Sequence, residues 1–432
     1  MSTQALIQRT GYAMDIELLL DHPAPRAGSP LTLRALVRVS GRAPDDTRRR
    51  PLNLAMVLDR SGSMAGPKLE HARDAAALLV RRIWPEDTVG VVAFCSEVIT
   101  LAAGATGDAH GTAEARIREI RTGGMTNLSG GWLRGRELVR EAFREEGVNR
   151  IVLMTDGLAN QGITDRTALE GLCRSARAEG ISTTTIGFGE DFDEDLLRAM
   201  ADAGGGATYY IEDPDQAPGI FEEEVEGLLS LAAQNVTIRM DPGPGALLSA
   251  VRHSYPTTPV GNGLRLDVGD LYAREPRLAL MDFRLEGAEP GSELEVATIT
   301  VQGYVLTDEG GVEQRTVDLP VRLRVGDGPR VEPEVRRVVA LLDAADARER
   351  AVRQREEGDW DDARLTLDEA ADRLQRELPG DAEAQREARG LRDIADRMRE
   401  GHYSISEAKY LKQQAYDLGR SRSLVRERYR RE

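Results

Sequence analysis

Hydrophobic and polar positions alternate in blocks from residue 52 to about residue 232, with short apolar runs separated by longer amphipathic stretches. The short runs are typical of buried strands, and the amphipathic stretches have the period of helices that cover a sheet. This order predicts an α/β fold, a doubly wound and mostly parallel sheet with helices on both faces. Strands are expected at Leu52–Leu58, Thr88–Phe94, Ile151–Thr155, Ile181–Gly187 and Thr208–Ile211, and helices at Lys68–Ile83, Ser129–Glu145, Thr167–Glu179, Asp193–Ala203 and Pro218–Ala233.

The pattern changes on both sides of this region. Residues 12 to 40 predict two strands, Tyr12–Leu20 and Leu31–Ser40, and residues 234 to 326 predict about six more, with Gly and Pro turns between them. Two strands cannot bury a hydrophobic face alone, so the first pair is expected to complete an antiparallel β-sandwich with the later strands. The α/β domain is then an insertion in that sandwich.

After Pro333 the sequence has helical spacing, broken near Gly358, Pro379 and Gly401. This pattern predicts a C-terminal α-helical bundle of three or four helices. The turn at Gly358 resembles that of a tetratricopeptide hairpin, but one such unit is not a repeat array. The expected segments are residues 1–50 (first sandwich strands), 51–232 (α/β domain), 233–330 (remaining sandwich strands) and 331–432 (helical domain).

Composition narrows the classes of partner. The chain has 432 residues, too many for one compact core, and a formal net charge of −16, which disfavours nucleic acid as a partner. No charged N-terminal lead precedes an apolar core, and no apolar run reaches about 18 residues, so we expect no membrane insertion and a cytoplasmic location. Cys95 and Cys173 lie in apolar segments and are expected to be buried thiols, although a disulfide between them stays open. The oligomeric state also stays open.

The first candidate metal ligands follow the first predicted strand of the α/β region, in the run Asp59-Arg60-Ser61-Gly62-Ser63. Asp59, Ser61 and Ser63 offer three hard oxygen ligands in a tight loop, and Mg²⁺ prefers such ligands. Taken alone, this pattern is more often a turn or a helix cap.

Two further loops favour a metal site over a turn or a helix cap. Thr126 lies in a glycine-rich loop, residues 122–129, and Asp156 follows the buried strand that ends at Thr155. Taken alone, Thr126 could cap a helix and Asp156 could belong to an ordinary turn. Loops at the carboxyl ends of parallel strands converge, however, so the three loops are expected to meet at one edge of the sheet. Together they predict a metal site.

The order Asp-x-Ser-x-Ser, then Thr in a glycine-rich loop, then Thr-Asp-Gly resembles the metal-ion-dependent adhesion site of von Willebrand factor A domains, over about residues 50 to 232. The resemblance implies that Ser61 and Ser63 bind the metal directly. Thr126 would bind it in the ligand-engaged state, and Asp59 and Asp156 would act largely through bound waters. Phe192–Leu197, Gly204–Gly206 and Tyr209–Tyr210 also resemble bacterial and inter-α-trypsin-inhibitor-type members.

Two aspartates balance the charge of a divalent ion, and neutral hydroxyl ligands leave that ion electron-poor. An open coordination position then favours a hard anionic oxygen. We therefore expect no enzyme but a protein-interaction module that binds an Asp or Glu carboxylate of a partner protein through Mg²⁺, with Mn²⁺ and Ca²⁺ as alternatives.

Two other functions stay open: a scaffold subunit that works with an ATPase, and a Mg²⁺-dependent phosphoester hydrolase with Asp59 as nucleophile. The hydrolase is disfavoured because haloacid-dehalogenase-type phosphatases need a second Asp where Ser61 stands. Asp191, Asp193 and Asp195 imitate a calcium loop, but Leu196 replaces the required glycine, so helix capping is the better interpretation.

Overall fold

The computed structural model describes most of the chain and divides it into two compact units. One unit comprises residues 1–42, 236–303 and 314–432, and the other comprises residues 43–235 and 304–313. The four segment boundaries drawn from the sequence are finer than this division and stay a prediction. The described residues are 6–9, 14–23, 26, 28–41, 50–156, 159–189, 192–211, 230–273, 275–286, 289, 291–306, 312–325, 328–400 and 405–420.

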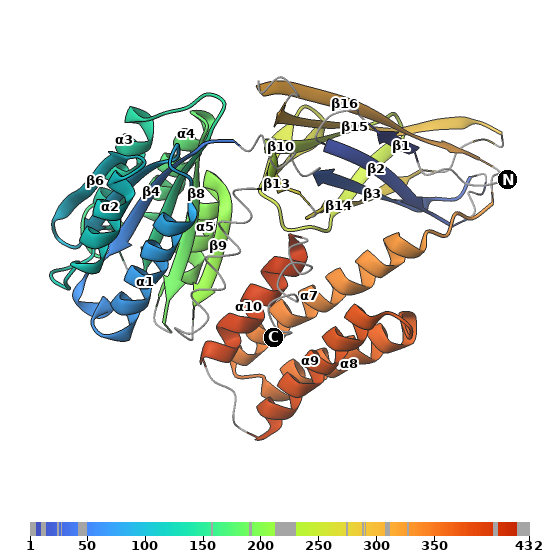
Figure 1. The fold of residues 1–432 in the computed structure, drawn as a ribbon. Coiled ribbons are helices and arrows are strands. Elements are labelled where there is room, and N and C mark those ends of the chain that lie inside the picture. The colour runs from blue at the N-terminus through green and yellow to red at the C-terminus, as the bar shows by residue number, and fades with distance from the viewer. Residues whose placement is uncertain are drawn as a thin grey trace. The chain divides into compact units, whose positions relative to one another are not determined.

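The second unit contains a six-stranded sheet with helices on both faces (Figure 1). Its strand order is β6-β5-β4-β7-β8-β9, and every neighbouring pair is parallel except β5 and β6. The predicted α/β class is therefore confirmed. The strands are β4 (Leu52–Asp59), β5 (Thr88–Phe94), β6 (Val98–Ala105), β7 (Val148–Thr155), β8 (Ile181–Phe188) and β9 (Gly205–Ile211). The helices are α1 (Pro67–Arg82), α2 (Ala109–Arg118), α3 (Leu128–Glu141), α4 (Arg166–Ala178) and α5 (Glu194–Gly204), with a short 3₁₀ turn, η1 (Gly62–Met64).

Apolar side chains of the helices and strands pack together on this sheet and exclude water from it. Helices α3, α4 and α5 share one core with alternate residues of β4, β5 and β7, around the fully buried Trp132. Helices α4 and α5 begin where the sequence predicts, because Asp165 and Asp193 accept hydrogen bonds from the first-turn N–H groups of Ala168 and Leu196. Asp193 is thus a helix cap, as expected.

Both cysteines are buried and form no disulfide. Burial raises the pKa of the Cys173 thiol to about 12. Such a thiol carries almost no reactive thiolate at neutral pH, which fits the expected structural role.

The first unit contains two five-stranded antiparallel sheets. Their orders are β1-β2-β3-β14-β11 and β12-β13-β10-β15-β16, so strands from both ends of the inserted segment occur in this unit, as the insertion predicts. The strands are β1 (Leu6–Arg9), β2 (Met14–Asp21), β3 (Leu31–Gly41), β10 (Leu231–Pro242), β11 (Ala246–Val251), β12 (Thr257–Val260), β13 (Gly263–Tyr272), β14 (Arg277–Leu285), β15 (Glu293–Leu306) and β16 (Val312–Arg324).

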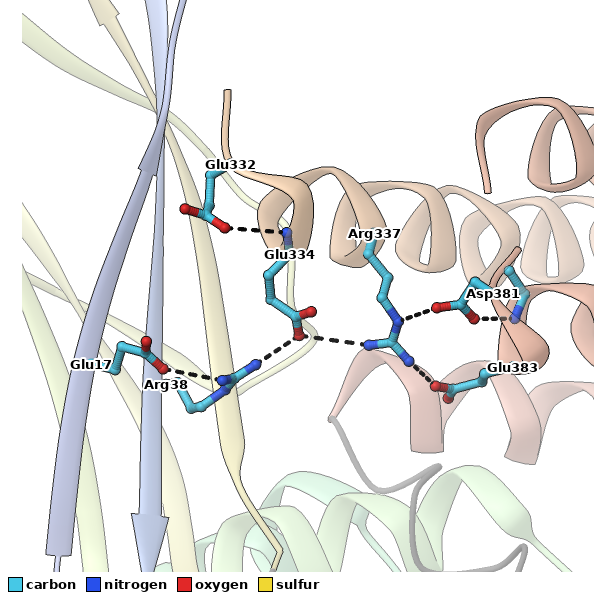
Figure 2. Close-up of polar contacts among 8 residues, drawn as sticks. Glu17, Arg38, Glu332, Glu334, Arg337, Asp381 and Glu383 are labelled. Atoms are coloured by element: carbon cyan, nitrogen blue, oxygen red, sulfur yellow. Dashed lines mark hydrogen bonds and ion pairs between the residues drawn. The ribbon is translucent and has the colours of Figure 1, made fainter. Parts of the chain in front are cut away.

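In the described residues after 331, four helices form a bundle with an alanine- and leucine-rich core. They are α7 (Pro333–Glu357), α8 (Trp360–Glu377), α9 (Ala382–Glu400) and α10 (Ile405–Gly419). Helix α7 also packs Val335, Val338 and Leu342 against Leu36 and Leu280 of the first sheet. Figure 2 shows an ion-pair chain at the same place, running from Glu17 through Arg38 and Glu334 to Arg337.

The structure differs from the expected elements at several places. Leu231, Ala232 and Ala233 belong to strand β10 and not to the end of a helix, because pairing within the second sheet outweighs their weak helical pattern. Residues 218–229 of that expected helix lie outside the described residues. Strands β1 and β6 and helix α2 were not predicted; β6 is a partly exposed edge strand, and its apolar signal is weak. Among the described helices, none is long and apolar enough to cross a membrane.

Candidate metal centre

Strand pairing brings the two predicted aspartates to one edge of the sheet. Strands β4 and β7 are parallel neighbours, with Leu58 opposite Met154. Asp59 is the last residue of β4, and Asp156 follows the last residue of β7. Both strands are buried along their whole length, so their side chains alternate between two covered faces, and the two aspartates come where the strands end.

Asp59 is held by its neighbours on both carboxylate oxygens. Its Oδ1 accepts a hydrogen bond from the Ser61 backbone N–H at 2.7 Å, and its Oδ2 accepts one from the Thr155 hydroxyl at 2.5 Å. The side chain has no exposed surface. Burial raises the pKa of Asp59 above its usual value, although the hydrogen bonds from Thr155 and Ser61 act in the opposite direction. A cation next to this carboxylate would remove the cost of its buried charge.

Ser61, Ser63 and Asp156 continue the cluster. The hydroxyl oxygens of Ser61 and Ser63 lie 3.1 Å apart, and the Ser63 hydroxyl donates to Asp156 Oδ1 at 2.8 Å. The other oxygen of Asp156 accepts a hydrogen bond from Lys68 Nζ, also at 2.8 Å. Ser61 and Asp156 are buried, whereas Ser63 is exposed, so the cluster opens to solvent on the side of Ser63.

The glycine-rich loop is attached to the first loop through the backbone. Gly62 N–H donates to Gly124 O at 3.1 Å, and Gly123 N–H donates to Arg60 O at 2.8 Å. Gly124 has a φ of +71°, and a Cβ there would lie 2.8 Å from the Ser96 hydroxyl oxygen, so the close approach requires glycine. The structure thus places the loop that carries Thr126 directly beside the loop that carries Ser61.

Thr126 is buried next to the cluster without being hydrogen-bonded into it. Its backbone N–H donates to Asn160 Oδ1 at 2.8 Å, and its carbonyl accepts from the N–H groups of Asn160 and Gln161. Among the described residues, the Thr126 hydroxyl forms no hydrogen bond with the other four predicted ligands. Asn127, not Thr126, caps helix α3 by accepting the Gly130 N–H at 3.0 Å, so the simple capping role does not explain Thr126.

The donor set suits a hard divalent cation. Two carboxylates and three hydroxyls supply only oxygen, and oxygen is the ligand that Mg²⁺ and Ca²⁺ prefer. Within the described residues, no group of three or more His, Cys, Asp or Glu could hold a metal. The candidate centre has only two such residues and depends on hydroxyls, so it belongs to a different class of site. The assignment of its five residues as ligands stays a prediction.

Three contacting residues were not found from the sequence: Thr155, Lys68 and Asn160. Thr155 directly precedes Asp156, so its place at the strand end was a usable signal. Lys68 is one of only three lysines in the chain, with Lys409 and Lys412, but nothing in the sequence indicated its contact with Asp156. No sequence signal indicated Asn160, because its contact with Thr126 depends on how two distant loops pack.

Comparisons with known proteins identify the domain that carries these residues. Residues 53–223 match the family model of the von Willebrand factor type A domain. An uncharacterized protein from Synechocystis sp. is 30% identical over 294 residues, which cover 65% of this chain and 69% of that protein. Inter-alpha-trypsin inhibitor heavy chain H3 from Rattus norvegicus is 30% identical over 218 residues, 48% of this chain but only 24% of the relative.

Solved structures share the fold over almost the whole chain. A von Willebrand factor type A protein from Catenulispora acidiphila has a TM-score of 0.73 and 17% identity, covering 95% of this chain and 98% of that one. The ArnB paralog VWA2 from Sulfolobus acidocaldarius has a TM-score of 0.59 and 20% identity, covering 95% and 99%. The family-model match, the relative covered over two thirds of its length and the common fold lead to one conclusion: this chain belongs to the von Willebrand factor type A domain family.

Proposed function

We propose that this protein is a non-enzymatic interaction module that binds a partner protein through a divalent cation. Mg²⁺ is the expected ion, with Mn²⁺ and Ca²⁺ as alternatives, and its ligands are Asp59, Ser61, Ser63, Thr126 and Asp156. The observation that carries the proposal is the hydrogen-bonded cluster of Asp59, Ser61, Ser63 and Asp156 where β4 and β7 end.

The chemistry of this cluster favours capture of a carboxylate. Hydroxyl ligands do not neutralise the ion, so an open coordination position keeps its preference for an anionic oxygen from outside the protein. On a protein surface, that oxygen comes most often from Asp or Glu. A formal net charge of −16 also favours a protein partner over nucleic acid.

The burial of Asp59 argues against the phosphoester hydrolase. A nucleophilic carboxylate must reach the phosphorus atom of a substrate, whereas Asp59 has no exposed surface and uses both oxygens in hydrogen bonds with Ser61 and Thr155. The same contacts suit a residue that balances the charge of a bound ion.

A capture experiment tests this function. The protein is immobilised, and cell extract is passed over it in Mg²⁺ or in EDTA, with elution by a peptide that carries Asp or Glu. We expect capture in Mg²⁺ alone, elution by the acidic peptide but not by its Asn or Gln analogue, and at least about a tenfold loss in Ser61→Ala. Ser175→Ala, an exposed serine of α4, is the matched control and should behave like the wild type. Capture that persists in EDTA and in Asp59→Ala would contradict the proposal.

A further inference from the structure

A lysine side chain contacts the candidate metal centre directly. Lys68 belongs to the first turn of α1, and its Nζ lies 2.8 Å from Asp156 Oδ2. The Asp156 side chain is 1% exposed and the Lys68 side chain 29%, so the ion pair joins a buried carboxylate to a partly exposed ammonium. With Ser63 bound to Asp156 Oδ1, both oxygens of this carboxylate contact side chains of the protein.

The backbone at the end of β8 leaves room for this lysine. Gly189 follows β8 with a φ of +78°, and a Cβ at this position would lie 2.6 Å from Lys68 Cε and 3.0 Å from its Nζ. A side chain at this position would meet only the flexible end of Lys68, which would have to shift to make room. Glycine at 189 thus leaves space for the end of the Lys68 side chain, which contacts the buried carboxylate of Asp156.

Charge decides what this arrangement does to a metal ion. An ammonium and a divalent cation that share one carboxylate repel each other, and partial burial reduces the screening by water. Lysine carries a compact charge on a flexible four-carbon stem, so it can withdraw into solvent when the ion binds. Its partial exposure gives it a path to do so.

We propose that Lys68 is a built-in counter-cation of Asp156 that competes with the divalent ion. In the metal-free protein its ammonium balances the buried carboxylate and keeps the centre together. Binding of the ion weakens or breaks the ion pair between Lys68 and Asp156. Lys68 therefore raises the metal concentration that is needed to occupy the centre. This inference rests on the proposed metal site and adds a residue that sets its affinity.

The first test measures metal binding alone, by calorimetric titration of the full chain with Mg²⁺ and Mn²⁺. In Lys68→Met, which keeps the length of the side chain but removes its charge, we expect the Kd for both ions to fall by about tenfold or more. In EDTA the same variant should have a lower Tm than the wild type, because Asp156 has lost its cation. Lys68→Arg, which keeps the charge, should keep the Kd of the wild type.

Two further variants complete the design. Arg81→Met removes a positive charge from the same helix at about 20 Å from Lys68 along its axis, and its Kd should stay within about twofold of the wild-type value. Gly189→Ala should lower the Kd by less than Lys68→Met does, because its methyl group makes the lysine end shift but keeps its charge.

Metal binding that is unchanged or weaker in Lys68→Met would overturn the inference, while capture of a partner in Mg²⁺ alone would still support the proposed function. Tighter metal binding with capture that ignores EDTA would support the inference and overturn the proposed function. If neither the wild type nor Lys68→Met binds Mg²⁺ or Mn²⁺ at millimolar concentration, both are overturned.

Discussion

His253 is an ionisable side chain that the fold keeps neutral. The ring is almost fully buried, its Nδ1 accepts the Leu280 backbone N–H at 3.0 Å, and it stacks on Tyr255. An accepting Nδ1 cannot carry a proton. Burial, and then the nearby charge of Arg252, lower the pKa of His253 to about 3. The unfolded chain, with a pKa near 6.5, therefore binds a proton that the folded chain does not.

This difference predicts a pH dependence. The contribution of His253 to stability is fully present above pH 6.5 and is lost as the pH falls from there toward 3. Between pH 7.5 and 5.5 the free energy of unfolding should fall by about 1.4 kcal/mol through this residue. His253→Asn keeps an acceptor and removes the titration, so urea unfolding at both pH values should show a smaller fall in the variant. An equal fall in the free energy of unfolding of the wild type and of His253→Asn would contradict the prediction.

The start of α7 is held by ion pairs on two sides, as Figure 2 shows. Arg38 of β3 pairs with Glu334 at 2.7 Å. One turn further along α7, Arg337 pairs with Asp381 at 2.7 Å and also with Glu334 and Glu383. Arg337 thus lies between three carboxylates and joins the start of α7 to the start of α9.

Removal of Arg337 should leave these three carboxylates without their common cation. In Arg337→Met we expect the free energy of unfolding to fall by about 1–3 kcal/mol, and the loss should shrink in 1 M NaCl, which screens the remaining repulsion. Arg353→Met is the matched control on the same helix, where one ion pair with Glu349 at 3.9 Å is well exposed. It should cost less than about 0.5 kcal/mol. Equal losses in urea unfolding would contradict the importance of this network.

At the scale of the whole molecule, the α/β region is an insertion that forms a unit of its own. Its two ends are joined within that unit, because Arg50 donates to the Gln234 side chain at 2.5 Å. A ligand bound at the ends of β4 and β7 therefore stabilises this unit first.

Metal addition should show this separation. At a Mg²⁺ concentration of 100 times the Kd, the unit that contains residues 50–211 should gain about 2.7 kcal/mol of stability. Hydrogen exchange should slow in strands β4, β7 and β8 and stay unchanged in β14 and in α7 to α9, and EDTA should reverse the effect. A similar slowing in both units would show that the ion acts elsewhere.

Local pattern was enough to predict most of the elements and the family. The apolar runs at β4, β7 and β8 and the aspartates that cap α4 and α5 depend on neighbours in the sequence, and the helical spacing after Pro333 does so too. Short-range order also named Asp59, Ser61, Ser63, Thr126 and Asp156 as ligands, although their binding of a metal stays a prediction.

Contacts between distant segments could not be predicted from the sequence. The edge strand β6, the strand start at Leu231 and the ion pair of Lys68 with Asp156 depend on pairing and packing between residues far apart in the chain. The sequence by itself therefore determined the α/β and flanking elements and the five oxygen-bearing positions, because periodicity and turn chemistry act over a few residues. Tertiary structure alone decided that Lys68 lies against Asp156, because this contact joins residues 88 positions apart in the chain.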